Sequence, residues 1–509
     1  MKRLITLALA ILMVLAVLCS CANNTDNPAD TTTVNNNDPA TTTSANNASD
    51  TTDKYDVIST LPELDYKDDV VTIISRGRSW CKDEVSVTDQ TGEAINDAIY
   101  NRNLAVEDRI HIKINNIMTS GTDNYEISET IRTQVTSGTK EYDLLTNSVY
   151  ASIMYTGDNL FANLLECELL DLEQKYWAQG FNDAASIGNA QYFATGAICL
   201  STYRFIFATF FNRNMFESNG IEFPYKVVED GKWTLDYQYE ISSNVYHDVN
   251  GDGVRDIDDV YGFVTNYDMI GVDAYWSSCK LPILTKTEDN WLEYSMDVDR
   301  LANAVTKINH LIWDNPGAYG VKHEANDSEQ ETIAAMFAND KAAMVTLRLI
   351  EAESGNLKNM QSDYGIVPIP KLDEAQDNYY SYAHDTVTAY AIPSNIIDDR
   401  LQEMGAVMEA MAAESYRTVV PAYYEVTLKD KYCNDPESKE MLDRIIDCFF
   451  IDAGVLYTKT ISSVHQKMRT FIGTNSNNVA SQMKVLARVV PTQLEKLLDG
   501  IRNIQERNG

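Results

Sequence analysis

The sequence has few basic residues and few histidines. Its 509 residues include 41 Lys and Arg against 75 Asp and Glu, which gives a formal net charge of −34 at pH 7, and only 6 His. A chain this negative is repelled by phosphate backbones and by anionic lipid surfaces. These numbers argue against nucleic acid as a partner and against membrane binding through basic patches, so any membrane attachment needs a separate device.

The common catalytic motifs are absent as well. The sequence contains no HExxH, GxSxG, GxGxxG or P-loop motif, and no CxxC that would indicate a metal knuckle or thioredoxin-like redox chemistry. Six cysteines lie beyond the N-terminal signal described below, and the sequence leaves open whether they are buried free thiols or form disulfides. These cysteines are Cys81, Cys167, Cys199, Cys279, Cys433 and Cys448.

An apolar run near the N-terminus, from Leu4 to Leu18, follows two basic residues. It has the length of a signal-peptide core and is shorter than the ~20 residues that a membrane-spanning helix needs. The run ends in Leu18-Cys19-Ser20-Cys21, which resembles the lipobox of bacterial lipoproteins. The resemblance implies that residues 1–20 are a lipoprotein signal peptide and that Cys21 receives the lipid anchor. Ordinary secretion, with cleavage near the same place, is the alternative.

A polar segment follows Cys21. It consists almost wholly of Asn, Thr, Asp, Ala and Ser, and Val34 is its single aliphatic residue beyond alanine. Because such a segment cannot bury apolar surface, we expect it to be disordered. Residues 21–54 are therefore predicted to be a lipidated tether that lets a folded body hang clear of the membrane.

The body is predicted to begin with an alternation of strands and helices. Hydrophobic residues make up 44% of the chain, which is enough to fill the cores of two or three domains. The βαβαβ order calls for a parallel sheet with crossover helices, and ligands bind beyond the carboxyl ends of such strands. The predicted strands are Val70–Ser75, His111–Ile117 and Tyr142–Thr146, and the predicted helices are Gly92–Ile110 and Tyr125–Val135.

A series of motifs follows in a fixed order. An aromatic strand is predicted over Tyr203–Phe211, and Asn212-Arg213 follows it directly. The later members are Gly220-Ile221, Pro224, Trp233-Thr234, Lys341–Val345 with Arg348, Tyr364–Lys371, Ala389–Pro393 and a helix of about 398–413.

This order resembles that of bacterial extracellular solute-binding proteins of ABC importers, of the family 1 type that includes the carbohydrate binders. The sequence departs from the family pattern at Arg213, where Lys is usual, at Trp233-Thr234, where the order is reversed, and at Asp340, where Gly is usual. The resemblance covers roughly residues 68–430. It implies an α/β fold of the two-lobed periplasmic-binding-protein type, in which the chain crosses a hinge more than once and a cleft closes on solute.

The resemblance and the apolar patterns together divide the body. Lobe 1 is predicted to comprise residues 55–203 and about 385–425, and lobe 2 about 204–384 and 426–509. Beyond about Asp435, helical spacing of apolar residues predicts extra C-terminal helices that serve packing.

A calcium loop is predicted at residues 248–259. The segment fits the EF-hand loop, in which hard oxygen ligands at alternate positions wrap one ion and the glycine at position six, here Gly253, permits the tight turn. Position twelve is Asp instead of Glu, as in dockerin-type loops, and a solvated acidic turn is the alternative. The predicted ligands of a structural Ca²⁺ are Asp248, Asn250, Asp252, Val254 through its carbonyl, Asp256 and Asp259.

Candidate ligand-binding residues lie in loops at the predicted strand ends. Sugars stack on aromatic rings, and their hydroxyls pair with planar polar groups, so these residue types suit a carbohydrate cleft. Core packing is the alternative for each aromatic residue, and a surface ion pair for Arg348 with Glu351. The candidates are Arg78, Trp80, Asn147, Tyr150, Asp273, Tyr275, Trp276, Arg348, Glu351, His384 and Asp385.

The leading hypothesis is a lipid-anchored solute-binding protein without enzymatic activity, on the extracellular or periplasmic side of the membrane. It would capture a solute, expected to be an oligosaccharide, and present it to the transmembrane subunits of an ABC permease. An extracellular glycoside hydrolase is the alternative, because 75 acidic residues could contain a catalytic pair. A surface sensor or adhesion receptor on the same fold is a third possibility.

Overall fold

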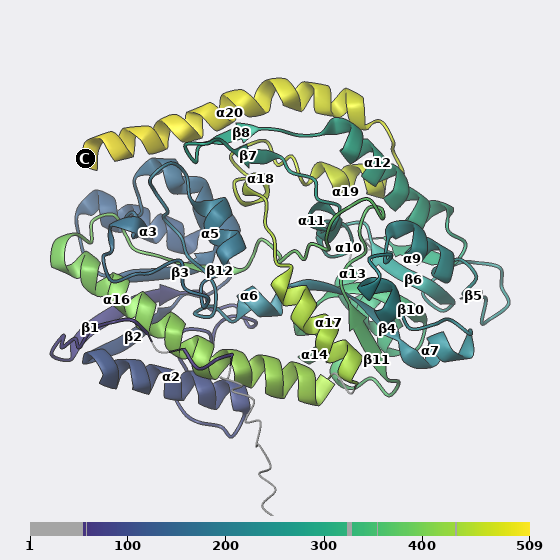
Figure 1. Cartoon of the computed structure of the whole chain (residues 1–509), viewed down its shortest axis with the longest axis horizontal. Coiled ribbons are helices and arrows are strands. Elements are labelled where there is room, and N and C mark those ends of the chain that lie inside the picture. Colours follow the sequence, from purple (N-terminus) through teal and green to yellow (C-terminus); the bar gives the residue numbers. More distant parts are fainter. Residues whose placement is uncertain (1–53, 58, 323–327, 354, 433–434, 509) are drawn as a thin grey trace, which may run out of the picture. The chain divides into compact units, whose positions relative to one another are not determined.

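The computed structural model describes residues 54–57, 59–322, 328–353, 355–432 and 435–508 (Figure 1). The predicted signal peptide, Cys21 and the tether up to residue 53 lie outside the described residues. The described residues belong to one compact unit, which contains two mixed β-sheets with helices around them. We call the parts built on these sheets lobe 1 and lobe 2. None of the helices in the described ranges is long and apolar enough to cross a membrane.

Lobe 1 contains a four-stranded sheet in the order β12-β3-β1-β2. Strand β1 runs parallel to both β2 and β3, with Ile73 opposite Leu144, and β12 is antiparallel to β3. The predicted βαβαβ order is thus confirmed. The elements are β1 (Asp69–Ser75), α2 (Ala94–Ile110), β2 (Ile112–Met118), α3 (Glu126–Ser137), β3 (Leu144–Ser148) and β12 (Thr388–Ala391).

The helices of lobe 1 form where the apolar spacing predicts them. In α2, Ile99, Val106 and Ile110 are buried, and they follow one face of the helix at the spacing that packing against a sheet requires. Helix α3 ends at Gly138, whose φ of 74° places it in the left-handed conformation that glycine adopts most readily at a helix C-terminus. Helix α2 ends at Ile110, directly before β2, whereas residues 138–143 connect α3 to β3.

Lobe 2 contains a six-stranded sheet in the order β11-β4-β10-β6-β5, with β9 paired to β6. Strand β10 is antiparallel to β4 and parallel to β6. The sheet places the Ala-Ala-Met strand of the sequence motif, β10, at its centre. The strands are β4 (Phe207–Asn212), β5 (Tyr246–His247), β6 (Val260–Asn266), β9 (Ala318–Val321), β10 (Ala342–Arg348) and β11 (Tyr364–Val367).

The predicted strand Tyr203–Phe211 is wrong in its first part. Residues Ser201–Arg204 form a helical turn, α6, and the strand pairing begins only at Phe207, opposite Arg348. The backbone N–H groups of Tyr203 and Arg204 donate to the carbonyl of Leu200. The aromatic content of the segment predicts a strand, but this local turn satisfies its first backbone groups instead.

The chain crosses between the lobes in two adjacent segments. The N–H of Phe207 donates to the carbonyl of Tyr382 at 2.9 Å, and the N–H of His384 donates to the carbonyl of Phe205 at 3.0 Å. Residues 205–207 and 382–384 therefore run antiparallel as a short two-stranded hinge. We refer to these two segments as the hinge.

The C-terminal part of the chain is helical, as predicted. The apolar positions Met441, Leu442 and Ile445 and, further on, Leu494 and Leu498 are buried, which confirms the expected packing faces. The helices are α16 (Asp398–Glu414), two π-helical stretches (Ser415–Val419 and Ala422–Tyr432), α17 (Pro436–Asp447), α18 (Ala453–Leu456), α19 (Lys467–Gly473) and α20 (Val479–Asn508).

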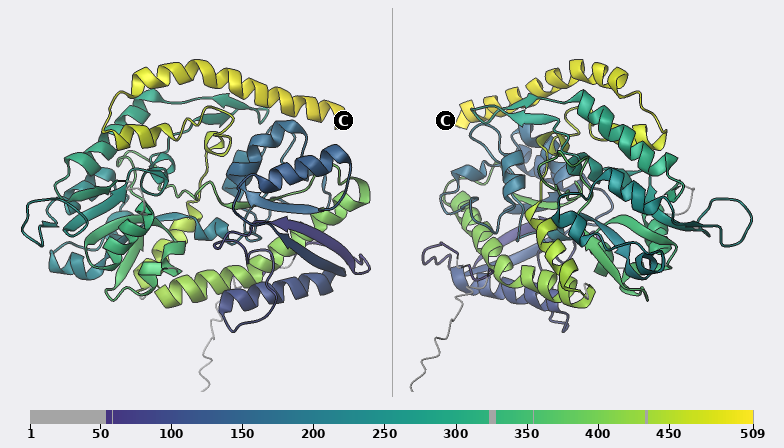
Figure 2. Two further views of the ribbon diagram at one scale, coloured as in Figure 1. Left: turned by 180° about the vertical axis from the view of Figure 1, so that it is seen from behind. Right: turned by 45° about the vertical axis from the view of Figure 1, so that its right-hand side comes forward.

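Helix α20 contacts elements of both lobes. It packs on the 3₁₀ helix Ile153–Asp158 of lobe 1 and on α12 (Val298–Asn309) and β8 (Leu292–Tyr294) of lobe 2. In both figures it lies along one edge of the molecule as a long yellow helix (Figures 1 and 2). A Cβ atom at Gly500 would lie 2.9 Å from the carbonyl oxygen of Gly157, so glycine permits the close approach to lobe 1.

A β-hairpin of lobe 2 reaches lobe 1 at the same edge. It consists of β7 (Leu284–Lys286) and β8, and its turn contains Asn290. The N–H of Gly188 in lobe 1 donates to the carbonyl of Asn290, and Asn290 Nδ2 donates to the carbonyl of Gly188, both at 2.9 Å. The lobes are therefore joined at this edge as well as at the hinge.

The described cysteines form no disulfide with one another. Cys81, Cys167, Cys199 and Cys279 are buried free thiols and Cys448 is a partly buried one, while Cys433 lies outside the described residues. Burial raises the pKa of the Cys81 thiol to about 12. Such thiols are protonated at neutral pH and behave as small apolar side chains.

Candidate functional site

A cavity of about 680 Å³ lies between the two lobes. Lobe 1 contributes the loop after β1, and lobe 2 contributes the end of β10 and the helices α13 (Glu329–Ala338) and α14 (Ile350–Glu353). It thus lies beyond the carboxyl ends of strands in both sheets, where ligands of open α/β sheets bind. Its volume is typical of a small-molecule site. We call it the interlobe cavity.

The wall in lobe 2 is a hydrogen-bonded cluster of three planar side chains. Arg348 Nη2 donates to Glu351 Oε1 at 3.0 Å and to Gln330 Oε1 at 3.2 Å, and Gln330 Nε2 donates to the same Glu351 oxygen. The Nε of Arg348 is buried and has no hydrogen-bond partner. The cluster is held in place before a solute arrives, and it presents guanidinium, amide and carboxylate groups of the kind that pair with sugar hydroxyls.

The wall in lobe 1 is built around Trp80, whose side chain remains 37% exposed and borders the cavity. The Arg78 guanidinium lies 5.5 Å from the centre of the Trp80 ring. Arg78 is anchored in turn by Asn124, whose Oδ1 accepts from its Nη2 at 3.0 Å. An exposed indole face opposite a planar polar cluster suits a ligand with one apolar and one hydroxylated side.

The hinge side of the cavity carries a second ion pair. Arg204 of α6 binds Glu353 in a bidentate manner, with Nε···Oε1 at 2.7 Å and Nη2···Oε2 at 2.9 Å. Both side chains are largely buried, and both line the cavity. Because Arg204 directly precedes the hinge and Glu353 lies in lobe 2, this pair ties the start of the hinge to the cavity wall.

Three of the predicted residues, Trp80, Arg348 and Glu351, thus meet in the interlobe cavity. Arg78 contacts it through Trp80. Arg348 and Glu351 do form an ion pair, which was the alternative to ligand binding for these two residues. The pair is not on the outer surface, however, because its side chains are only 16% and 14% exposed and line the cavity.

Asp273 is buried in lobe 2 and is fully engaged by the C-terminal helices. Arg469 of α19 binds it through Nε at 2.8 Å and through Nη2, and the ring of His465 lies 3.7 Å from Oδ2. Burial alone would raise the pKa of Asp273, but the hydrogen bonds from Arg469, together with the nearby His465 ring, outweigh it and lower the pKa to about 2. Asp273 is therefore ionised at neutral pH and already paired.

Tyr275 and Trp276 follow Asp273 in a short helix, α11 (Ala274–Ser278), and are fully buried in the core of lobe 2. Asn147 is buried in β3, where its Nδ2 donates to Ser152 Oγ at 2.8 Å. Tyr150 lies at the end of β3, where its hydroxyl accepts from Tyr125 and the Lys459 ammonium lies 4.6 Å from its ring centre. None of these side chains borders the interlobe cavity.

His384 and Asp385 lie at the hinge. The Nδ1 of His384 is 2.8 Å from Thr386 Oγ1 and 3.2 Å from Asp385 Oδ1. Burial lowers the pKa of His384 more than the neighbouring Asp385 raises it. The ring is therefore neutral at neutral pH, and its contacts fix the backbone where the chain returns to lobe 1.

The predicted calcium loop lies between β5 and β6. Asp248 accepts from the N–H groups of Gly251 (2.6 Å) and Gly253 (2.9 Å), while Asp252 accepts from the N–H of Val254 at 2.7 Å. Asp259 is fully buried and accepts from the Tyr246 hydroxyl at 3.1 Å. The loop is thus folded by its own carboxylates, and over the described residues no three His, Cys, Asp or Glu side chains are gathered as a metal would gather them.

Sequence reasoning missed Gln330, Asp83 and Arg204 at the cavity, and Arg469 and His465 at Asp273. Gln330 and Asp83 belong to no motif, so no local signal marks them. His465 lies in the turn before α19 and Arg469 lies within that helix, so no helical spacing marks these two residues either.

No protein-family model matches the chain, and no curated protein matches it in sequence. Its structure does match solved structures. An ABC substrate-binding protein from Listeria monocytogenes in complex with cycloalternan is 12% identical, with a TM-score of 0.50 over 86% of this chain and 99% of that one. The apo form of RafE from Streptococcus pneumoniae is 13% identical, with a TM-score of 0.50 over 85% of this chain and 97% of that one.

The GacH receptor of Streptomyces glaucescens, solved unliganded and in complex with acarbose, has a similar structure. It is 13% identical, with a TM-score of 0.50 over 84% of this chain and 98% of that one. At identities this low the likeness establishes the fold. The two-lobed periplasmic-binding-protein fold predicted from the sequence is thereby confirmed.

The buried pair of Asp273 and Arg469 yields a prediction on stability. Arg469→Met leaves a buried carboxylate without its main partner, so we expect a loss of about 3–5 kcal/mol in the free energy of unfolding. The matched control is Arg502→Met, which removes an exposed pair with Glu495 and should cost less than about 1 kcal/mol. Urea unfolding at pH 7 measures both, and equal losses would contradict the structure.

The same pair predicts a pH dependence. Because the folded state holds the pKa of Asp273 at about 2, below its value of about 3.9 in an unfolded chain, Asp273 contributes stability above about pH 5 that disappears as the pH falls towards 2. In Asp273→Asn this acid-dependent loss should be smaller than in the wild type. Urea unfolding from pH 7 to pH 3 tests this, and identical pH profiles would refute it.

Proposed function

We propose that this chain is the solute-binding component of an ABC importer and holds an oligosaccharide in the interlobe cavity without changing it chemically. The observation that carries the proposal is the cavity itself, in which the exposed Trp80 of lobe 1 faces the Arg348–Glu351–Gln330 cluster of lobe 2. The fold supports it, since chains of this fold include an ABC substrate-binding protein in complex with cycloalternan and a receptor in complex with acarbose.

The chemistry of the two walls favours a sugar over other solutes. The apolar face of a pyranose needs an apolar partner, which the Trp80 ring provides, and buried hydroxyls need paired groups, which the lobe 2 cluster provides. The carboxylates of Glu351 and Glu353 are each paired with an arginine. Each of these two pairs is neutral, and the other charged groups that line the cavity are the exposed carboxylates of Asp83 and Glu331. These two carboxylates can accept hydrogen bonds from hydroxyls and would repel an anionic solute.

The two-segment hinge supports capture by closure. Bending at residues 205–207 and 382–384 moves the Trp80 loop against the end of β10, because each wall belongs to a different lobe. A solute that contacts both walls then stabilises the closed arrangement. Closure would present surfaces of both lobes to the transmembrane subunits of a permease.

We further propose that Cys21 carries a lipid anchor that holds the protein on the extracellular or periplasmic face of the membrane. The support is the lipobox-like Leu18-Cys19-Ser20-Cys21 after an apolar run, and a diacyl anchor gives stable retention where one chain is marginal. In cells, we expect Cys21→Ala to move the protein from the membrane fraction to the soluble or secreted fraction. Cys448→Ala is the control, and retention of both variants in the membrane would argue against the anchor.

The capture of an oligosaccharide is tested by calorimetric titration with neutral tri- and tetrasaccharides, cycloalternan and acarbose. We expect the wild type to bind at least one of them and Trp80→Ala to bind it about tenfold more weakly, equivalent to ~1.4 kcal/mol. Leu165→Ala, an exposed residue of lobe 1 outside the cavity, should bind as the wild type does. Absence of binding at millimolar sugar, or release of reducing ends on incubation, would refute the proposal.

We also propose that residues 248–259 bind one structural Ca²⁺. The donor set fits a hard cation, because Asp248, Asn250, Asp252, Asp256 and Asp259 supply side-chain oxygens and Val254 supplies its carbonyl at the alternate positions of an EF-hand loop. Calcium would replace backbone N–H groups as the partners of these carboxylates. Its role would be to pin the loop between β5 and β6, away from the interlobe cavity.

Calorimetric titration of chelator-treated protein tests the calcium site. We expect one Ca²⁺ per chain in the wild type and a loss of at least tenfold in affinity for Asp252→Ala, since each carboxylate contributes to ion affinity. Asp299→Ala, in the first turn of α12, is the control and should bind as the wild type does. A wild type that shows no heat at millimolar Ca²⁺ would exclude the site.

A further inference from the structure

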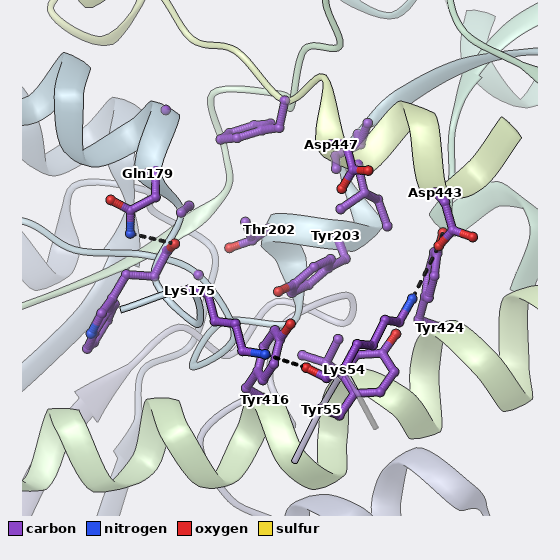
Figure 3. Close-up of a pocket in the computed structure, with 18 residues that line it drawn as sticks. Lys54, Tyr55, Lys175, Gln179, Thr202, Tyr203, Tyr416, Tyr424, Asp443 and Asp447 are labelled. Atoms are coloured by element: carbon purple, nitrogen blue, oxygen red, sulfur yellow. Dashed lines mark hydrogen bonds and ion pairs between the residues drawn. The ribbon is translucent and has the colours of Figure 1, made fainter. Parts of the chain in front are cut away.

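A second cavity, of about 390 Å³, lies beside the hinge and shares no lining residue with the interlobe cavity (Figure 3). Thr202, Tyr203 and Ile206 border it, whereas Arg204, between them, borders the interlobe cavity. Side chains of one short segment thus point into two separate spaces. We call the second space the hinge pocket.

The walls of the hinge pocket come from both lobes. Lobe 1 contributes Trp177 and the start of α5 (Gln179–Ala185), and α17 contributes Ile446 and Asp447. Helix α17 packs on β11 of lobe 2, and Ser438 of α17 accepts from the N–H of Ile366 in that strand at 3.2 Å. The remaining wall comes from the π-helical stretches after α16, with Tyr416 and Tyr424.

Two glycines in the wall of the pocket permit close contacts between backbone segments. A Cβ atom at Gly180 would lie 3.0 Å from the carbonyl oxygen of Phe449, and one at Gly196 would lie 2.4 Å from the carbonyl oxygen of Tyr176. Gly196 also has a φ of 148°, which side-chain-bearing residues rarely adopt. The backbone therefore forms part of the wall, and aromatic rings form most of the rest.

Polar groups with unused hydrogen-bonding capacity face this aromatic space. Tyr203 extends into the pocket, and its hydroxyl forms no hydrogen bond with the described residues (Figure 3). Burial raises the pKa of Tyr203, so its hydroxyl keeps its proton. Asp447, at the exposed end of α17, has no cation within ion-pair distance among the described residues, and the Lys175 ammonium donates only to the carbonyl of Lys54, at 2.6 Å.

The aromatic rings also offer a place for a cation, but the chain itself occupies it. The Lys54 ammonium lies 4.8 Å and 5.0 Å from the ring centres of Tyr55 and Tyr424 and pairs with Glu425 at 3.1 Å and Asp443 at 3.2 Å. An organic cation would have to displace this lysine. The Lys175 ammonium likewise lies 5.3 Å from the centre of the Tyr416 ring, but one hydrogen bond to Lys54 leaves it two further donors. The Tyr203 phenol, this ammonium and the Asp447 carboxylate, set around aromatic faces, therefore suit a neutral ring with several hydroxyls.

We propose that the hinge pocket is a second ligand site and takes a single sugar ring. The ring lies against the aromatic walls, its hydroxyls donate to Asp447, and they accept from Tyr203 and Lys175. The volume suits a ligand smaller than the oligosaccharide assigned to the interlobe cavity. The site is independent of that assignment, because the two cavities have different walls.

The test titrates the full chain with D-glucose, D-galactose, D-xylose and L-arabinose by calorimetry. We expect at least one of them to bind. Tyr203→Phe keeps the ring and removes the hydroxyl, so we expect about fivefold weaker binding, the effect of one lost hydrogen bond. The control is Trp80→Ala, which alters the interlobe cavity alone and should leave monosaccharide binding unchanged.

Two outcomes would overturn the proposal. One is the absence of monosaccharide binding to the wild type at sugar concentrations up to roughly tens of millimolar, at which a ligand with a millimolar Kd would still be bound. The other is monosaccharide binding that falls in Trp80→Ala and stays unchanged in Tyr203→Phe, which would place the sugar in the interlobe cavity. Titration of Tyr203→Phe with the oligosaccharides distinguishes failure of this proposal from failure of the proposed function. If oligosaccharides bind in the interlobe cavity, their binding should be unchanged in this variant.

Discussion

The antiparallel pairing of the two crossing segments is the constraint on which the rest of the structure depends. The hydrogen bonds from Phe207 to Tyr382 and from His384 to Phe205 fix both strands of the hinge at once. Since β4 continues from one segment and β12 follows the other, the pairing sets the positions of both sheets. Ile206 of the hinge lines the hinge pocket, and Arg204, directly before the hinge, lines the interlobe cavity, so the same few backbone hydrogen bonds position part of the wall of each.

Ion pairs preorganise part of the wall of the interlobe cavity for ligand binding. Arg348 with Glu351 and Arg204 with Glu353 are each largely buried and satisfied by one another before any solute is present. A chain of net charge −34 could easily leave carboxylates exposed in a cleft. Two lining carboxylates, Asp83 and Glu331, do remain exposed. At Glu351 and Glu353, however, pairing removes the cost of desolvating a lone charge when a ligand arrives, so binding energy is not spent on reorganising this part of the wall.

The sequence predicted the sheets better than the cavity. Apolar periodicity located β1 to β3 and the C-terminal helices, because burial on one face repeats along the chain. It failed at Tyr203, where a local turn replaces the expected strand. It also could not separate Trp80, which borders the cavity, from Trp276, which lies in the core: both are aromatic residues beyond a strand end, and only tertiary packing decides which is covered. Arg469 and Asp273 are 196 residues apart, and no local pattern connects them.

The C-terminal helices restrict how the lobes can move. Helix α20 contacts both lobes, and Gly188 and Asn290 exchange hydrogen bonds at the same edge. A hinge motion that separated the lobes along this edge would break these backbone contacts and expose apolar residues of α20 such as Leu494 and Leu498. A rotation about a line that joins the hinge to this edge would keep them. The hydrogen bonds between Gly188 and Asn290 and the burial of Leu494 and Leu498 therefore favour a rotation of this kind over a separation of the lobes at this edge.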